Sequence, residues 1–484
     1  MVKFYITTPI YYVNDRPHVG HAYTTVLADI IARWHKLKGE DVFFLTGLDE
    51  NSQKTIEASK KLSFTDVKKF TDFMADEWKK TWKNLNVDYS DFIRTTEERH
   101  KKLVLGFTKK IINSGDTYIG KYSGLYCEGC EGFVNETDLT SDGLCVFHKK
   151  LPKTIEENNY FFKLTKYRDE LLKYINENPD FIQPVSRRNE VLSFINSGLK
   201  DISISRENAQ WGIGFPNDKN HKIYVWFEAL QNYLQPKKYW PANIHLMAKD
   251  IIKFHAIIWP AMLMSAKYKL PKKIFAHGFF TVNGTKMSKS LGNFIDPNFL
   301  VNKYGVDALR YFYAREIPFG QDGDFSETSL KLRLNNELAN ELGNLISRSL
   351  TLVEKKLNSK IKKDKTDKNL FKILDIKRLD NFMKNLEPHN VIAGIFGFIH
   401  ECNVYINQNE PWKLEDEKQL NYILYNLVDA LRIIAILIYS FMPSTAEEIN
   451  KQLGIKLGTL KDCKPGKLEN VKINKGKILF NKIE

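Results

Sequence analysis

Two histidines with two residues between them, His18 and His21, form the segment HVGH near the start of the chain. The segment follows a strand-like run at residues 2–8 and opens a helical pattern, where unpaired backbone N–H groups and the helix dipole favour an anion. Two imidazoles can donate hydrogen bonds to the same phosphates, and Gly20 lets a nucleotide approach the backbone. We therefore predict a phosphate site here. The alternative is that both histidines only cap the helix.

A second basic segment, KMSKS at residues 286–290, follows a strand-like run and an Asn-Gly turn. The ammonium groups of Lys286 and Lys289 suit the charge that appears on pyrophosphate when ATP is attacked at its α-phosphorus. Alone, the segment could be a basic turn. In this order and at this distance, HVGH and KMSKS resemble the paired signatures of class I aminoacyl-tRNA synthetases, which implies that both bind ATP together with Mg²⁺.

Four longer segments, ITTPIYYVNDRPHVGHAY, YVWFEALQNYL, KDIIKFH and HGFFTVNGTKMSKSLGN, resemble the methionyl-tRNA synthetase family. The resemblance covers nearly the whole chain. It implies that Asp49 holds the methionine ammonium group and that Asp250 contacts ATP, although Ala248 stands where the family usually has glycine. It also implies a methionine pocket lined by Ile10, Tyr12, Trp226, Ala229, Leu230, Tyr233, Ile251 and His255. Such an apolar, aromatic cavity suits a thioether, but the same residues could be ordinary core.

Three cysteines and a histidine form the pattern C-x2-C-x14-C-x2-H, at Cys127, Cys130, Cys145 and His148. Two such pairs separated by a loop are typical of a zinc site, and four protein ligands would make it structural. We expect one Zn²⁺ that stabilises an insertion over the active site. The alternative is chance proximity of reduced cysteines.

Towards the C-terminus, Asn344 and Arg348 stand four residues apart on a predicted helix, and Trp412 follows Pro411 in a later turn. An amide and a guanidinium can read the edges of unpaired RNA bases, and an indole offers a stacking surface. The segments ELGNLISRS and NEPW resemble the elements with which the family reads the tRNA anticodon.

These residues need a fold that brings them together. Residues 2–45 read as β-α-β, which implies a parallel sheet with ligands at the carboxyl ends of its strands. Strand-like runs recur at residues 222–227, 244–247 and 273–276, and from Ser329 the pattern is helical. We predict an α/β chain with a Rossmann-like catalytic domain, a zinc-knuckle insertion and an all-α anticodon-binding domain. The boundaries are 1–118 and 207–328 for the two catalytic halves, 119–206 for the insertion and 329–484 for the helical domain.

Length and composition limit the classes of protein. A chain of 484 residues with 43% hydrophobic residues can build several cores, which argues against a disordered protein or a single small module. The net charge of +14 suits a polyanion such as tRNA, or reflects only a lysine-rich surface. Three of the five cysteines cluster and two stand apart, which is poorly suited to a disulfide framework. This arrangement, and the lack of a signal-peptide or membrane-span pattern, predict a cytoplasmic protein. Because no β-barrel module follows the helical domain, we expect a monomer.

The sequence thus predicts a methionine–tRNA ligase that forms methionyl-adenylate from L-methionine and ATP. The methionyl group then passes to the terminal adenosine of methionine tRNA, for translation initiation and elongation. A synthetase for valine, isoleucine or leucine is the nearest alternative, although residues 119–206 leave little room for an editing domain. The other alternative is an RNA-binding or scaffold protein that has kept the fold without its activity.

Overall fold

The computed structural model describes residues 1–127, 132–134, 138–147, 149–207, 209–282, 285–286 and 294–483. The chain opens with β1 (Lys3–Tyr12), α1 (Val19–Leu37) and β2 (Asp41–Asp49), which confirms the β-α-β prediction. The two strands pair in parallel, from Lys3 beside Asp41 to Tyr12 beside Asp49. Helix α1 is buried almost all round, including the charged Asp29, and is therefore not the one-sided amphipathic helix that its apolar period indicates.

A six-stranded sheet in the order β3-β2-β1-β12-β13-β7 forms the centre of the catalytic region. The other strands are β3 (Asp91–Arg94), β12 (Ile244–Ala248), β13 (Ile274–His277) and β7 (Ile182–Gln183), and every pairing is parallel. The carboxyl ends of the strands therefore share one edge. Because β1 is followed by β2 on one side and flanked by β12 on the other, the strand order reverses at β1, where such folds bind their ligands.

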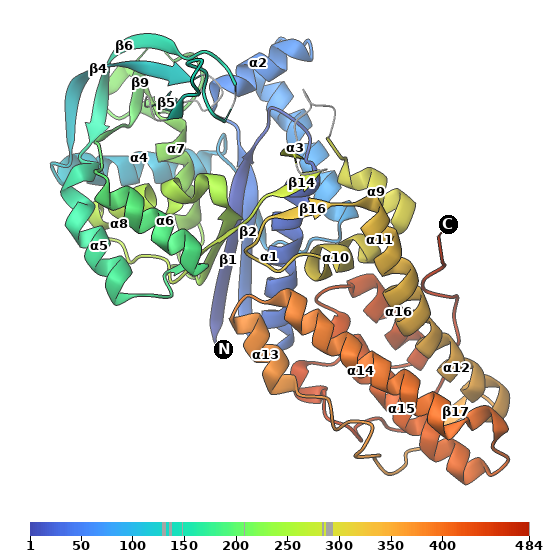
Figure 1. The fold of residues 1–484 in the computed structure, drawn as a ribbon. Helices are drawn as coiled ribbons and strands as arrows, with labels where there is room; N and C mark the ends of the chain where they lie inside the picture. The colour runs from blue at the N-terminus through green and yellow to red at the C-terminus, as the bar shows by residue number, and fades with distance from the viewer. Residues whose placement is uncertain are drawn as a thin grey trace.

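Figure 1 shows helices on both faces of this sheet and a separate strand layer beyond its upper end. The helices and strands of the chain up to residue 207, besides those already given, are α2 (Gln53–Lys61), α3 (Val67–Asn84), α4 (Glu98–Asn113), β4 (Thr117–Cys127), β5 (Gly132–Val134), β6 (Lys153–Phe162), α5 (Arg168–Glu177), α6 (Val185–Asn196), β8 (Ile202–Ser203) and β9 (Ser205–Glu207). Strands β5, β4, β6 and β8 form a sheet of their own. Between them in sequence, β7 returns to the edge of the central sheet.

The run at residues 222–227 is not a strand throughout. Strand β10 (Gly214–Phe215) precedes it, β11 (Asp218–Ile223) covers only its first two residues, and α7 (Val225–Ala229) covers its last three. A short apolar run fits a buried strand and a buried helix equally well, which is why the periodicity misled the prediction. As a result, Trp226 projects from a helix.

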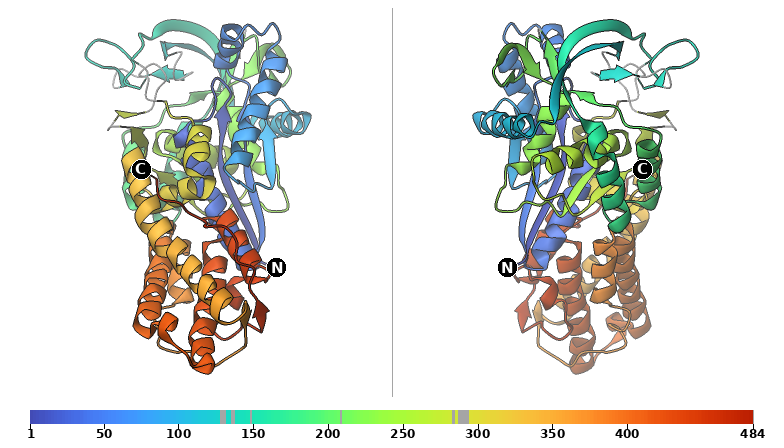
Figure 2. Two further views of the ribbon diagram at one scale, coloured as in Figure 1. Left: turned by 90° about the vertical axis from the view of Figure 1, so that its right-hand side faces the viewer. Right: turned by 90° about the vertical axis from the view of Figure 1, so that its left-hand side faces the viewer.

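The remaining elements lead from the central sheet to a helical domain. They are α8 (Trp259–Ser265), β14 (Phe280–Val282), β15 (Thr285–Lys286), α9 (Pro297–Tyr304), α10 (Val306–Arg315), β16 (Gly323–Phe325), α11 (Glu327–Arg333), α12 (Asn344–Lys356), β17 (Lys360–Ile361), α13 (Ile376–Lys384), α14 (Pro388–Asn409), α15 (Glu417–Ile438), α16 (Pro443–Leu453) and β18 (Val471–Lys472). A π-helical segment at Leu334–Gly343 joins α11 to α12. Figure 2 places this domain at the opposite end of the molecule from the β4–β6 layer.

Helix α15 is the core of the helical domain. Among the described residues it alone is long and apolar enough to cross a membrane, yet 89% of its apolar window is buried inside the protein. Its apolar surface is accounted for by packing against its neighbouring helices.

Candidate active site

The two histidines of HVGH cap α1 with one ring nitrogen each. The backbone N–H of Gly20 donates to His18 Nδ1 at 3.0 Å, and the backbone N–H of His18 donates to His21 Nδ1 at 3.3 Å. Because Nδ1 is the acceptor in both rings, the neutral tautomer of each carries its proton on Nε2. Burial, with a contribution from His18, lowers the pKa of His21 well below its ordinary value, so His21 stays neutral. Both histidines therefore do cap α1, and in each ring the nitrogen opposite the cap, Nε2, carries the proton.

An aromatic cluster fixes the His21 ring. The ring lies edge-on to Tyr11, with centroids 5.0 Å apart, and 5.1 Å from Trp78, while Tyr11 and Trp78 stack on each other. The Tyr11 hydroxyl is held by Thr25 of α1 at 2.8 Å. The sequence did not predict this contact, because Trp78 lies on α3, far along the chain from His21.

The chain just beyond KMSKS lies against HVGH. The backbone N–H of Val19 donates to the carbonyl of Ile295 at 3.1 Å, and the Phe294 ring stands edge-on to His18. On the other side, Lys286 belongs to β15, which pairs with β14. Lys289 lies outside the described residues. Both flanks of the segment are thus anchored at the carboxyl edge of the sheet, beside the α1 N-terminus.

The end of β12 supplies the Ala248–Asp250 segment to the same edge. Ala248 has φ −78° and ψ 155°, an ordinary extended conformation, so the backbone here does not require glycine. Lys249 pairs with Asp322 at 2.6 Å. A side chain at Gly278 would meet the Gln321 and Asp322 backbone at 2.4 Å, so only glycine permits this close packing after β13.

Aromatic side chains form the wall of the predicted methionine pocket. Trp226 stacks on Phe254 with centroids 3.7 Å apart and stands edge-on to Tyr12 and to His255, at 6.4 and 6.5 Å. Phe254 was missed, although it adjoins His255 in the KDIIKFH segment. Edge and face contacts of this kind leave polarisable surfaces suited to a thioether sulfur.

A hydrogen-bonded pair lies behind that wall. Tyr233 Oη donates to His255 Nε2 at 2.8 Å, while His255 Nδ1 donates to the carbonyl of Ile251 at 3.0 Å. Burial lowers the pKa of His255 to about 4, so the ring is neutral and its tautomer is fixed by these two bonds. Ala229, Leu230 and Tyr233 are buried, and Ile10 and Ile251 are half-buried against the same apolar cluster. All the predicted pocket residues thus gather around one end of β1, β12 and α7.

Asp49 ends β2 directly beside Tyr12, its register partner on β1. It is only 4% exposed. A carboxylate at this point adjoins the aromatic wall through Tyr12, which is the arrangement that an amino acid with a cationic amine and an apolar side chain needs.

In the helical domain, Arg348 and Trp412 are in contact. The Arg348 guanidinium lies over the Trp412 ring, 5.4 Å from its centroid, and donates to Asn407 Oδ1 at 2.8 Å. Trp412 is 39% exposed, and Asn344 lies exposed one turn before Arg348 on α12. The three predicted residues therefore share one accessible surface, to which the structure adds Asn407 of α14.

The predicted zinc ligands are described only in part. Cys127, at the end of β4, and Cys145, which forms an isolated bridge with Leu139, are both buried, and neither forms a disulfide. Cys130 and His148 lie outside the described residues. No group of three possible metal ligands occurs within the described part of the chain. Two buried cysteines at either side of one loop have the side chains that a zinc-thiolate site uses.

Comparisons with known proteins cover nearly all of the chain. A family model described as "tRNA synthetases class I (M)" matches residues 4–145 and 135–350, and one described as "Anticodon-binding domain of tRNA ligase" matches residues 374–477. The methionine–tRNA ligase of Caldanaerobacter subterraneus subsp. tengcongensis is 44% identical, over 99% of this chain and 79% of that protein. The methionine–tRNA ligase of Rickettsia felis is also 44% identical, over 93% of this chain and 92% of that protein.

Two solved structures superpose on this chain over its whole fold. Mycobacterium tuberculosis methionyl-tRNA synthetase in complex with methionyl-adenylate superposes with a TM-score of 0.95, at 37% identity over 99% of this chain and 100% of that one. The free form of that enzyme gives a TM-score of 0.87 at 34% identity, over 100% of this chain and 99% of that one. The parallel-sheet catalytic region followed by a helical anticodon-binding domain is thereby confirmed. The chain belongs to the methionyl-tRNA synthetase family of class I tRNA synthetases.

Proposed function

We propose that this protein is a methionine–tRNA ligase. In the first step the carboxylate of L-methionine attacks the α-phosphorus of ATP, forming methionyl-adenylate and releasing pyrophosphate. In the second, a ribose hydroxyl of the terminal adenosine of methionine tRNA attacks the carbonyl carbon, and AMP leaves. We assign this attack to the 2′-hydroxyl by family resemblance alone.

One observation supports the proposal: the N-terminus of α1 follows the same strand whose last residue adjoins both a buried carboxylate and an aromatic wall. His18 and His21 begin α1 just after β1, whose last residue Tyr12 borders both Asp49 and Trp226. The reacting carboxylate and the α-phosphate would be held in one place, and this proximity lowers the barrier without a protein nucleophile.

Each group has a defined part in the first step. The Nε2–H of His18 and of His21 would donate to phosphate oxygens, while Lys286 and Lys289 would neutralise the departing pyrophosphate. Gly20 and Asp250 would contact the nucleotide. Mg²⁺ bound to ATP would supply further charge neutralisation.

Pyrophosphate exchange into ATP, measured with each amino acid offered singly, tests the activity. We expect exchange with methionine, a strong loss in Lys289→Ala, and no loss in the matched control Lys109→Ala on the exposed face of α4. Exchange driven by another amino acid would contradict the substrate. No exchange with any amino acid would favour an inactive RNA-binding protein.

For the metal, we propose one structural Zn²⁺ held by Cys127, Cys130, Cys145 and His148. The C-x2-C-x14-C-x2-H spacing supports it, and the burial of Cys127 and Cys145 is compatible with it. Elemental analysis of the purified protein should give one zinc per chain, and less in Cys145→Ser. Equal zinc in both proteins would contradict the ligand set.

We further propose that the protein reads the methionine anticodon with Asn344, Arg348 and Trp412, and that it acts as a cytoplasmic monomer. The large exposed apolar side chains of the described residues occur singly or in pairs on many different elements, which favours a monomer. Light scattering at micromolar concentration would test the oligomeric state, and a dimer mass would contradict it.

A further inference from the structure

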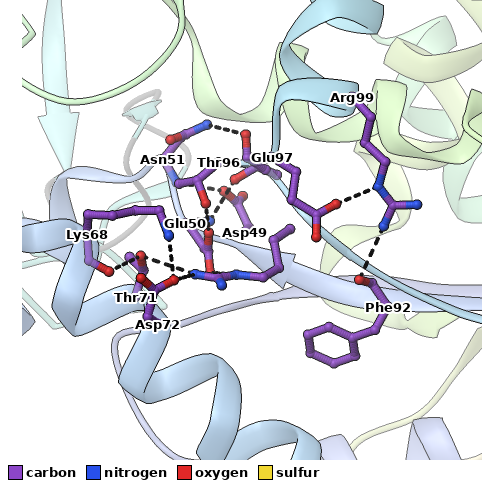
Figure 3. A network of polar contacts seen from close by, with 12 residues as sticks. Asp49, Glu50, Asn51, Lys68, Thr71, Asp72, Phe92, Thr96, Glu97 and Arg99 are labelled. Carbon is purple, nitrogen blue, oxygen red and sulfur yellow. Dashed lines mark hydrogen bonds and ion pairs between the residues drawn. The ribbon is translucent and has the colours of Figure 1, made fainter.

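The turn between β2 and α2 is held by an unusually dense set of polar contacts, which Figure 3 shows from close by. The backbone N–H of Glu50 donates to Thr95 Oγ1 at 2.9 Å, and the fully buried Glu50 carboxylate accepts from Arg94 Nε at 2.7 Å and from Thr96. Arg94 in turn pairs with Asp72 of α3 at 2.7 Å. These contacts fix the backbone that follows Asp49 to the end of β3.

Asn51 links this turn to a different part of the molecule. Its Nδ2 donates to the carbonyl of Thr95 at 3.2 Å and to Glu228, at 2.9 Å from Oε1 and 3.2 Å from Oε2. Its backbone N–H points at Asp49 Oδ1, 3.4 Å away. Both amide protons of the Asn51 side chain are therefore engaged, and the residue bridges the Asp49 turn and α7.

Glu228 accepts the hydrogen bonds of that bridge. It lies on α7 between Trp226 and Ala229 and has no solvent exposure. Both of its carboxyl oxygens accept from Asn51. His100 of α4 also lies close, with its Nε2 3.8 Å from Glu228 Oε2. Burial raises the pKa of Glu228 to about 8, while the Asn51 hydrogen bond and the Lys101 charge act to lower it. Burial lowers the pKa of His100 to about 3, so it brings no charge to Glu228.

The Asn51–Glu228 contact links the two segments that are proposed to bind methionine. Asp49 is the proposed ligand of the methionine ammonium group, and Trp226 is the proposed wall against its side chain. Asn51 stands two residues after Asp49, and Glu228 stands two residues after Trp226. The Asn51–Glu228 bond therefore ties the segment that carries the charged anchor to the segment that carries the wall. Distance between a charged anchor and an apolar wall is what distinguishes amino acids of different length.

We propose that Asn51 and Glu228 are positioning residues that hold the Asp49 carboxylate in register with the Trp226 wall. Neither touches the substrate in this arrangement. The inference rests on the proposed function, in which Asp49 binds the ammonium group. Removing the bridge leaves the pocket and the ATP site in place but lets Asp49 move relative to the wall.

The test compares two tight-binding ligands, a non-hydrolysable methionyl-adenylate analogue and the same compound without its α-amino group. Affinities for both are measured by calorimetry in Asn51→Ala, Glu228→Ala, Glu228→Gln and the double variant Asn51→Ala/Glu228→Ala. Asn178→Ala, an exposed asparagine whose amide bonds only within its own helix end, is the matched control.

We expect Asn51→Ala to lose about tenfold in affinity for the amine-bearing compound, the size of one buried hydrogen bond. Its affinity for the deaminated compound should stay within about twofold, because the aromatic wall and the phosphate site are unchanged. Glu228→Gln keeps an acceptor for Asn51 and should bind like the parent protein. The double variant should lose no more than Asn51→Ala alone, since both substitutions break the same bond.

Equal losses for both compounds would overturn the inference, because they would mean that the substitution damages the fold of the pocket. Unchanged binding of the amine-bearing compound by Asn51→Ala would overturn it as well, as would additive losses in the double variant. Failure of the proposed function gives a different result: the parent protein itself would then neither bind the amine-bearing compound nor exchange pyrophosphate with methionine.

Discussion

A buried ionic network joins the catalytic region to the helical domain, and it gives a quantitative prediction. Asp29 of α1 has no solvent exposure and accepts from Arg33 Nε at 2.8 Å, from Arg310 Nη2 at 2.6 Å and from the backbone of Asp88 at 2.8 Å. Arg310 of α10, also fully buried, further donates to the carbonyls of Ser440 and Phe441, between α15 and α16. One carboxylate therefore balances two guanidinium groups at the junction of the two regions.

Asp29→Asn removes the negative charge of the carboxylate while keeping the shape of the side chain. Two buried guanidinium groups then lack a counter-charge, which costs about 3–5 kcal/mol in comparable buried pairs. For a chain of this size, whose unfolding entropy is about 1 kcal/mol/K, that corresponds to a fall in Tm of roughly 3–5 °C. Because the lost contacts include the Ser440–Phe441 segment, we also expect the helical domain to separate as its own unfolding transition.

Scanning calorimetry measures both effects, and Asp169→Asn, an 88% exposed aspartate on α5, is the matched control. Equal Tm values for Asp29→Asn and the control would refute the assignment of Asp29 as the balancing charge. Arg310→Met combined with Asp29→Asn should cost less than the sum of the two single changes, since both act in one network. Full additivity would likewise contradict the reasoning.

The same network predicts an acid dependence. Burial by itself would raise the pKa of Asp29, but the Arg310 and Arg33 guanidinium groups lower it below its ordinary value. A lowered pKa in the folded state stabilises the fold above the unfolded value, near pH 4, and the stabilisation is lost as the pH falls further. Below about pH 4, the difference in stability between the parent protein and Asp29→Asn should therefore shrink. A difference that stays constant down to pH 2 would contradict this origin.

Three further substitutions test the site. Trp412→Ala should lower kcat/KM for tRNA charging by about tenfold, the value of one stacked base, and leave pyrophosphate exchange unchanged; equal losses in both would make Trp412 structural. Tyr233→Phe leaves His255 Nε2 buried without its donor, so KM for methionine should rise about tenfold with KM for ATP unchanged, as exchange kinetics would show. His21→Ala should reduce exchange much more than Thr24→Ala on the same helix, and equal effects would indicate helix stability alone.

The sequence was sufficient for the fold class because its strongest signals are local. The strand before His18 and the apolar period of α1 depend only on nearby residues, and both were predicted correctly in type. The strand prediction at residues 222–227 was wrong because it, too, relied on local signals alone. In a short run that is buried on every side, a helix and a strand require the same apolar residues, and only tertiary packing decides between them.

Contacts between distant elements could not be read from the sequence. Phe254 stacks on Trp226, Trp78 holds His21, and Asn407 holds Arg348, yet each pair joins segments that are far apart in the chain or separated by a turn. None of the three has a residue type that signals chemistry by itself. Family resemblance located the groups expected to touch the substrates, and the structure was needed to find the groups that support them.

The two interpretations of HVGH, a helix cap and a phosphate site, are compatible because they use different nitrogen atoms. Capping engages Nδ1 of His18 and of His21 as acceptors, which fixes each neutral ring with a proton on Nε2. Without the caps, each ring would exchange between tautomers, and one of them would present a lone pair to phosphate. The cap therefore prepares the donor before ATP binds. On this basis, a histidine at an α-helix N-terminus is better assessed by which nitrogen the cap uses than by whether it caps at all.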